Sequence, residues 1–132
     1  MEPLLLGLRH VALNVRNVAK AAEFYTEVLG MKLEWLPDKE NAYLTSGKDN
    51  LALHELPAGS EPGLVQTLHH IGFIVRAPEQ VDEWAERIRH KGIALAQEPK
   101  THRDGARSIY FRDPDGLLIQ LLYHPPISDN SG

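Results

Sequence analysis

Two segments of the chain, sixty residues apart, share one pattern of side chains, and this internal repeat constrains the fold more than any other feature. RHVALNVR at residues 9–16 aligns with HHIGFIVR at residues 69–76, so that His10 matches His70. Both segments alternate between apolar and other residues, as a half-buried β-strand does. A repeat of this kind indicates two copies of one supersecondary unit.

Each copy continues with the same order of expected elements. The first has a strand at 8–16, a helix from the N-cap Asn17 to Gly30, and strands at 31–37, 41–47 and 50–56. The second has a strand at 68–76, a helix at 77–92, and strands at 93–97, 106–112 and 116–123. The fold class is therefore α+β, with two paired βαβββ modules forming a curved mixed sheet around a cleft.

The repeat also predicts that residues 1–124 form one domain. Its first module spans 6–57, a Pro- and Gly-rich linker spans 58–67, and its second module spans 68–124. Residues 125–132 are expected to be a flexible tail.

Polar residues interrupt the apolar strands at matching places. Alternation places His10 and His70 on the sheet faces that point away from the helices. Aligning NLALHEL with GLLIQLL pairs His54 with Gln120, again opposite the apolar residues. We therefore expect these four side chains to lie at equivalent positions in the cleft.

This set of side chains favours a metal site. A single histidine on an apolar strand is more often a hydrogen-bonded core residue than a ligand, but four matched polar positions favour a site jointly. Imidazole nitrogens and an amide oxygen can all bind a divalent ion. The predicted ligands are His10, His70 and Gln120, with His54 as a fourth candidate, and the ion is zinc, iron, nickel or manganese.

Composition excludes several classes of protein. The net charge of −4 gives no basic footprint for nucleic acid, and the absence of cysteine excludes disulfides and thiolate metal sites. No apolar run approaches the ~20 residues of a membrane helix, and the first residues do not read as a secretory signal. We expect a cytoplasmic protein without a nucleic-acid or membrane partner.

Several motifs together resemble one known superfamily. RHVALNV, AAEFYTEVLGMKL, NLALHEL, HHIGFIV and above all SIYFRDPDGLLIQLL carry the resemblance, which covers about residues 6–124. The sequence resembles the vicinal oxygen chelate superfamily of glyoxalase I, extradiol dioxygenases, and fosfomycin- and bleomycin-resistance proteins. Within it, the chain is most similar to small single-domain glyoxalase-domain-containing proteins. The resemblance implies paired βαβββ units and the homodimer that we expect.

The resemblance also implies roles for single residues. His10 and His70 match two metal ligands, Gln120 stands where the family usually has a glutamate ligand, and His54 lies at or beside the fourth position. In glyoxalase I the metal-bound glutamates take part in proton transfer. An amide cannot act as a general base, so glyoxalase I activity is not expected here.

The expected function is that of a divalent-metal-dependent lyase or isomerase that stabilises an enolate or oxyanion of a small oxygen-bearing substrate. Two alternatives stay open: a ferrous extradiol-type dioxygenase, and a metal-free small-molecule binding protein of the antibiotic-sequestering type. The substrate-binding candidates are His54, Tyr110 and Arg107, and the basic loop 99–107 is a candidate lid. The sequence assigns no catalytic residue, and it leaves open whether the modules pair within one chain or between two.

Overall fold

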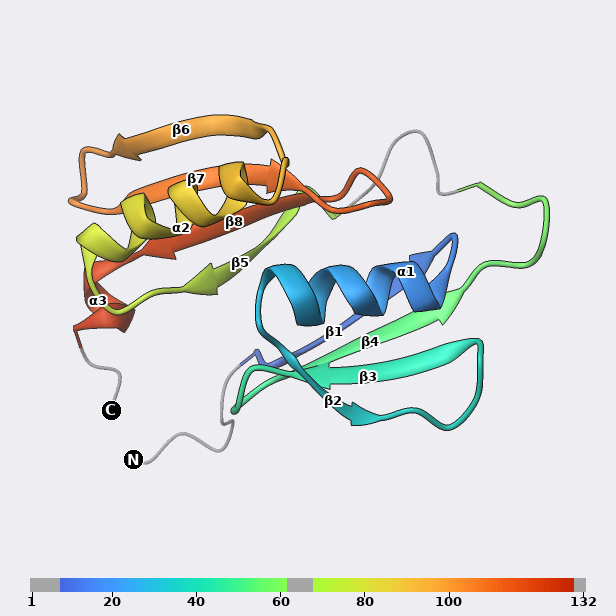
Figure 1. Cartoon of the computed structure of the whole chain (residues 1–132). Coiled ribbons are helices and arrows are strands. Elements are labelled where there is room, and N and C mark those ends of the chain that lie inside the picture. The colour runs from blue at the N-terminus through green and yellow to red at the C-terminus, as the bar shows by residue number, and fades with distance from the viewer. Residues whose placement is uncertain (1–7, 62–67, 130–132) are drawn as a thin grey trace, which may run out of the picture. The chain divides into compact units, whose positions relative to one another are not determined.

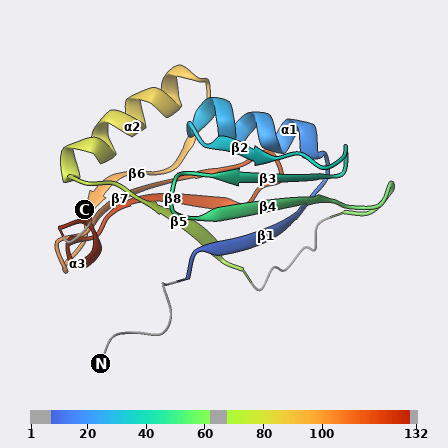
Figure 2. The same ribbon diagram turned by 90° about the horizontal axis from the view of Figure 1, so that it is seen from below.

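The computed structural model describes residues 8–61 and 68–129, and the chain divides into two compact units, Met1–Leu64 and Val65–Gly132. Each unit contains a four-stranded mixed sheet with a helix on one face (Figures 1 and 2). The predicted α+β class is confirmed.

The first unit has the predicted βαβββ order. Its elements are β1 (His10–Val15), α1 (Val18–Glu23), the π-helical turn η1 (Phe24–Val28), β2 (Lys32–Trp35), β3 (Asn41–Thr45) and β4 (Asn50–Glu55). The strands lie in the order β1-β4-β3-β2, with β1 and β4 parallel and the other pairs antiparallel.

The second unit repeats this arrangement. Its elements are β5 (His70–Ile74), α2 (Pro78–His90), β6 (Leu95–Thr101), β7 (Arg107–Arg112), β8 (Leu118–Tyr123) and α3 (Pro125–Ser128). The strand order is β5-β8-β7-β6, and β5 and β8 are the parallel pair.

The helix-facing side of each sheet forms the hydrophobic core. In the first unit, Leu13 and Val15 of β1 and Leu51 and Leu53 of β4 are buried, while His10 is exposed on the opposite face. The second core is built in the same way, and its fully buried side chains include Val81, Ile88, Ile109, Phe111, Ile119 and Leu121. The predicted faces of the first and last strands of each unit are therefore confirmed.

Helices α1 and α2 both begin with a side chain that accepts hydrogen bonds from backbone amides. Oδ1 of Asn17 accepts a hydrogen bond from the Lys20 amide at 2.9 Å, which confirms the predicted N-cap. At the start of α2, Oε1 of Gln80 accepts from the amides of Arg76 and Ala77. Gly30 follows η1 with a φ of 77°, a conformation that suits glycine.

Two segments differ from the sequence expectation. Strand β6 continues to Thr101, so the first part of the predicted loop 99–107 pairs with β7. The segment expected to be a flexible tail begins with α3, where the buried Ser128 donates a hydrogen bond from Oγ to the Val75 carbonyl oxygen at 2.7 Å. Residues 130–132 and most of the predicted linker lie outside the described residues.

Within the described parts of the chain, no helix is both long enough and apolar enough to cross a membrane.

Candidate functional site

The polar face of the second sheet brings three of the predicted site residues together. Tyr110 on β7 lies directly opposite Gln120 on β8, and Gln120 lies beside Gly72 on β5. The rings of His70 and Tyr110 meet edge to face, with their centroids 5.4 Å apart. Thus His70, Tyr110 and Gln120 form one polar cluster on the face opposite α2.

Gln120 is the most constrained member of this cluster. Only 9% of the residue is exposed, and among the described residues its side-chain amide has no hydrogen-bond partner. Gly72 accommodates it, since a Cβ atom at residue 72 would lie 3.6 Å from Oε1 of Gln120. Because Gln120 lines the pocket described next, its unpartnered amide can hydrogen-bond or coordinate a ligand there.

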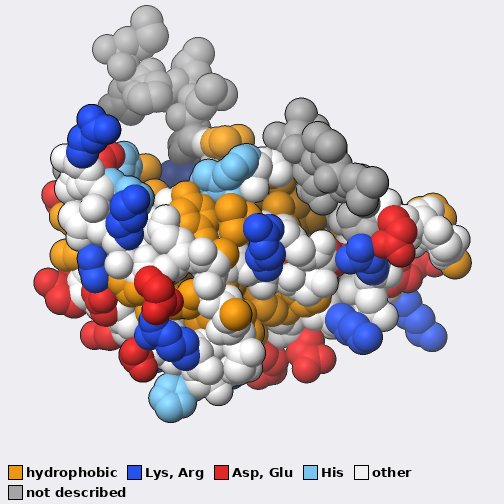
Figure 3. Space-filling view, turned by 90° about the horizontal axis from the view of Figure 1, so that it is seen from above, with side chains coloured by type: hydrophobic (Ala, Val, Ile, Leu, Met, Phe, Trp, Pro, Cys, Tyr) orange, Lys and Arg blue, Asp and Glu red, His pale blue; other side chains and the backbone are white. Residues whose placement is uncertain are grey.

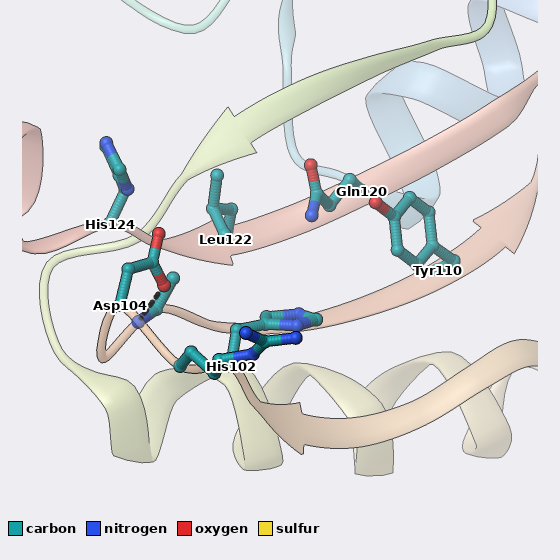
Figure 4. A pocket seen from close by; sticks show the side chains of 8 residues that line it. His102, Asp104, Tyr110, Gln120, Leu122 and His124 are labelled. Atoms are coloured by element: carbon teal, nitrogen blue, oxygen red, sulfur yellow. Dashed lines mark hydrogen bonds between the residues drawn. The ribbon is translucent and has the colours of Figure 1, made fainter.

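A pocket of about 630 Å³ opens in front of Gln120 and lies entirely within the second unit (Figure 4). Its lining residues are His102, Arg103, Asp104, Ala106, Tyr110, Gln120, Leu122 and His124. In Figure 4 the amide nitrogen of Gln120 points toward the loop that carries His102, and its oxygen points toward β5. Amide, phenol and guanidinium groups therefore offer hydrogen-bond donors to the pocket, and Ala106 and Leu122 contribute apolar side chains to its lining.

The loop that forms one wall of the pocket is held by local hydrogen bonds. The His102 amide donates to the Ala106 carbonyl at 2.7 Å, and Oδ1 of Asp104 accepts from the Ala106 amide at 3.0 Å. Nε2 of His102 lies 3.0 Å from Oγ of the fully buried Ser108. This wall is therefore anchored to β7.

The structure places Arg107 away from the pocket, contrary to its expected role as a substrate contact. Arg107 shares the face of Ile109 and Phe111, and its guanidinium binds both carboxylate oxygens of Asp82 on α2, at 2.7 and 3.0 Å. This pairing lowers the pKa of Asp82 and raises that of Arg107. Arg103 is the basic residue of this loop that lines the pocket.

In the first unit, His10 has an oriented ring. Nδ1 of His10 lies 2.8 Å from Oδ1 of Asn50, and the Asn50 amide group donates to Oε1 of Glu34 at 3.0 Å. Because the amide NH₂ is directed to Glu34, the oxygen faces His10, and Nδ1 must carry the hydrogen. Nε2 is left with its lone pair, which is the arrangement that outer partners give to a histidine ligand.

The strand register corrects the predicted pairing of His54 with Gln120. Gln120 lies opposite Gly72 and Tyr110, and the matching position in the first unit is Ala52, which lies opposite Ala12 and Tyr43. His54 instead lies opposite Asn14, four residues along the strand from the His10 position, or roughly 13 Å. The structure does not bring His10 and His54 together.

A profile of known proteins fits this chain over most of its length. The model of the "Glyoxalase/Bleomycin resistance protein/Dioxygenase superfamily" matches residues 7–121. The chain belongs to this superfamily. Its paired βαβββ units, derived above from the repeat, are the fold that the resemblance predicted.

Individual superfamily members are similar to this chain along most of their length. The chain is 32% identical to the metallothiol transferase FosB of Shouchella clausii, over 87% of this chain and 78% of the relative. It is 31% identical to the fosfomycin resistance protein FosX of Listeria innocua, over 89% and 90% of the two chains. The crystal structure of a glyoxalase/dioxygenase from Nostoc punctiforme covers 95% of this chain, and the chain covers 96% of it, with a TM-score of 0.76 and 27% identity.

The predicted ligands of this superfamily member offer nitrogen and oxygen donor atoms of the kinds that bind divalent cations. His10 offers Nε2, and Gln120 offers an amide oxygen that has no other partner among the described residues. His70 is less defined, because its Nδ1 lies 2.8 Å from Nδ1 of His69. Within residues 8–61 and 68–129, no three His, Cys, Asp or Glu side chains group in a metal-binding arrangement.

Charged side chains of both signs lie on the face of the molecule shown in Figure 3. On the face shown in Figure 3, acidic and basic side chains are interspersed among apolar ones.

Proposed function

We propose that this chain is a divalent-metal-dependent enzyme that acts on a small oxygen-bearing molecule. The observation that carries the proposal is the side-chain amide of Gln120, which has no partner among the described residues and borders a pocket lined by polar and charged side chains, although only 9% of the residue is exposed. The amide therefore keeps its hydrogen-bonding atoms available to a ligand that enters the pocket.

The proposed metal ligands are His10, His70 and Gln120. A cation bound by them supplies Lewis-acid stabilisation of negative charge on substrate oxygen atoms. Asn50 acts through His10, because it keeps the hydrogen on Nδ1 and leaves Nε2 as the donor atom. Two neutral imidazoles and a neutral amide leave the full positive charge of the ion available to an anionic substrate.

The pocket residues would bind and orient the substrate. The Tyr110 hydroxyl can donate a hydrogen bond to a substrate oxygen, and Arg103 can neutralise an anionic group of the substrate. Leu122 and Ala106 offer apolar contact to its carbon atoms. This combination suits a compact molecule that carries several oxygen atoms on a short carbon skeleton.

The reaction proposed is of the lyase or isomerase type, without glyoxalase I proton transfer. The amide of Gln120 has no basic site of useful pKa and therefore cannot take the proton that a carboxylate would take. The relatives named metallothiol transferase and fosfomycin resistance protein make fosfomycin, with and without an added thiol, the first compound to test. A ferrous dioxygenase is less well supported, because that chemistry prefers a carboxylate beside two histidines.

A second candidate function is metal-free binding of a small molecule. It is favoured by the uncharged Gln120 and by the absence of a metal-binding group of three acidic, histidine or cysteine side chains in the described parts of the chain. In that case Gln120, Tyr110 and Arg103 would bind the ligand by hydrogen bonds alone.

Metal analysis of protein purified without a histidine tag or chelator separates the two candidates. The enzyme proposal expects about one equivalent of zinc, nickel, manganese or ferrous ion, and loss of that ion in His10→Ala and in His70→Ala. His90→Ala is the matched control, because His90 lies at the C-terminal end of α2. If the protein binds none of these ions after loading, the metal-dependent function is contradicted, and metal-free binding of a small molecule remains as the candidate function.

We also propose a homodimer, the state expected from the resemblance. Size-exclusion chromatography with light scattering measures the molar mass of the protein in solution. A monomeric mass at micromolar concentration would contradict the homodimer.

A further inference from the structure

A second ordered histidine lies on the polar face of the first sheet, away from His10. Nδ1 of His54 lies 2.6 Å from Oδ1 of Asn41, the residue directly opposite it on β3. The Asn41 amide group in turn donates to both carboxylate oxygens of Asp38, at 2.9 and 3.2 Å. Asp38, Asn41 and His54 thus form a continuous carboxylate–amide–imidazole chain.

The direction of these hydrogen bonds fixes the hydrogen on the His54 ring. A backbone hydrogen bond from Glu40 and the Asn41 amide lower the pKa of Asp38, so this carboxylate is ionised and only accepts. The NH₂ group of Asn41 must therefore face Asp38, and its oxygen must face His54. Because an amide oxygen only accepts, Nδ1 of His54 carries the hydrogen and Nε2 carries the lone pair.

The Nε2 atom of His54 is available to a ligand. Among the described residues it has no hydrogen-bond partner, and the residue is only partly exposed. The Tyr43 ring meets the His54 ring edge to face with centroids 6.1 Å apart, and Trp35 stacks on Tyr43 at 5.1 Å. Trp35 itself is 59% exposed. Nε2 of His54 is therefore an oriented hydrogen-bond acceptor next to the aromatic rings of Tyr43 and Trp35.

The chain Glu34–Asn50–His10 has the same architecture. The two carboxylate–amide–imidazole chains share no residue, and together they draw on β1, β2, β3, β4 and the connection before β3. Their recurrence indicates that the orientation of Nε2 is a built feature of this unit. A histidine that only filled space would not need its tautomer fixed in this way.

We propose that His54 binds a hydroxyl or N–H donor of a small ligand through Nε2, and that Asn41 and Asp38 are positioning residues that hold Nε2 as the acceptor. The role does not depend on a cation, because His54 lies roughly 13 Å along the sheet from the His10 position. The proposed role of His54 is therefore tested independently of the metal-dependent function proposed above.

The tautomer is tested by long-range proton–nitrogen NMR at a pH where the imidazoles are neutral. The wild-type protein is expected to show the hydrogen on Nδ1 for both His54 and His10. Asn41→Leu should change the His54 tautomer and leave that of His10, and Asn50→Leu should do the reverse. Asp38→Asn, a milder change, should give a mixed His54 tautomer. A wild-type His54 with its hydrogen on Nε2 would overturn the proposal.

The binding role is tested with phenol, which has a hydroxyl donor, and with its methyl ether anisole, which has none. Titration followed by His54 and Trp35 signals should give a dissociation constant about fivefold lower for phenol, the effect of one hydrogen bond of about 1 kcal/mol. In His54→Phe, which keeps a ring but removes the acceptor, the two probes should bind equally. Equal affinity of phenol and anisole for the wild-type protein would refute the assignment.

Discussion

Gln120 lies beside Gly72 across the parallel pair β5–β8, and a Cβ atom at residue 72 would lie 3.6 Å from its amide oxygen. This distance is an ordinary van der Waals contact, so a single methyl group fits, whereas further carbon atoms would compete with the amide for the same space. Gly72 therefore leaves Gln120 free to take up a ligand.

The first prediction concerns this contact. Gly72→Val should displace the Gln120 side chain, because its γ-methyl groups extend beyond the Cβ position. The side-chain NH₂ signals of Gln120 in a proton–nitrogen NMR spectrum should shift strongly. Gly72→Ala is the control and should shift them little. Unchanged signals in Gly72→Val would show that residue 72 does not set the position of the amide.

The second prediction tests Gln120 as a metal ligand. Gln120→Glu adds a negative charge at the proposed ligand position and should tighten binding of zinc or manganese by about tenfold or more, or about 1.4 kcal/mol. Without metal, the same change should lower the free energy of unfolding by about 1–3 kcal/mol, since it places a charge at a buried position. Calorimetric titration and urea unfolding measure the two effects. Gln120→Leu should weaken metal binding, and equal affinity in all three proteins would exclude a ligand role.

The third prediction concerns pH and the pair formed by Asp82 and Arg107. The hydrogen-bonded guanidinium lowers the pKa of Asp82 in the folded state, so the pair stabilises the fold above the unfolded-state pKa of about 3.9. That contribution is lost as pH falls through the lower, folded-state value. Asp82→Asn should therefore be less stable than wild type by about 0.5 kcal/mol near pH 7, because the pair is largely exposed.

The measurement is urea unfolding of both proteins between pH 7 and pH 3. The difference in unfolding free energy should decrease as pH falls below the unfolded-state pKa of the Asp82 carboxyl, and added salt should reduce it at neutral pH. A difference that does not change with pH would show that the ion pair is not its cause.

The fourth prediction concerns the attachment of α3. Oγ of Ser128 donates to the Val75 carbonyl at 2.7 Å and accepts from the His124 amide at 3.0 Å. Ser128→Ala leaves both half-buried backbone groups without this partner and should lower the free energy of unfolding by about 1 kcal/mol. Ser60→Ala, at an exposed position, is the control. Equal stability of the two variants would show that α3 contributes little to the fold.

The periodicity of the sequence was sufficient to predict the architecture. Alternation identified the buried faces of β1, β4, β5 and β8, and Asn17 and Gly30 marked the ends of the first helix correctly. The same alternation could have placed Arg107, since it shares the parity of the buried Ile109 and Phe111. Its basic charge and its place next to the loop led instead to an expected substrate contact.

Asn41 and Asn50 were missed as site residues. Each stands at the start of a strand, where a turn signal is the usual explanation for asparagine. Their parity with Tyr43 and His54 was the one signal in the sequence that placed them on the polar face.

The sequence by itself determined two βαβββ units and which side chains face away from each helix, because a period of two fixes the face of every residue in a strand. Only the tertiary structure decided how far along the sheet those side chains lie. A shift of two residues keeps every side chain on its face, so alternation could not distinguish Ala52 from His54 as the counterpart of Gln120. Interstrand hydrogen bonds decide that register, and they separate His54 from His10 while joining it to Asn41 and Asp38.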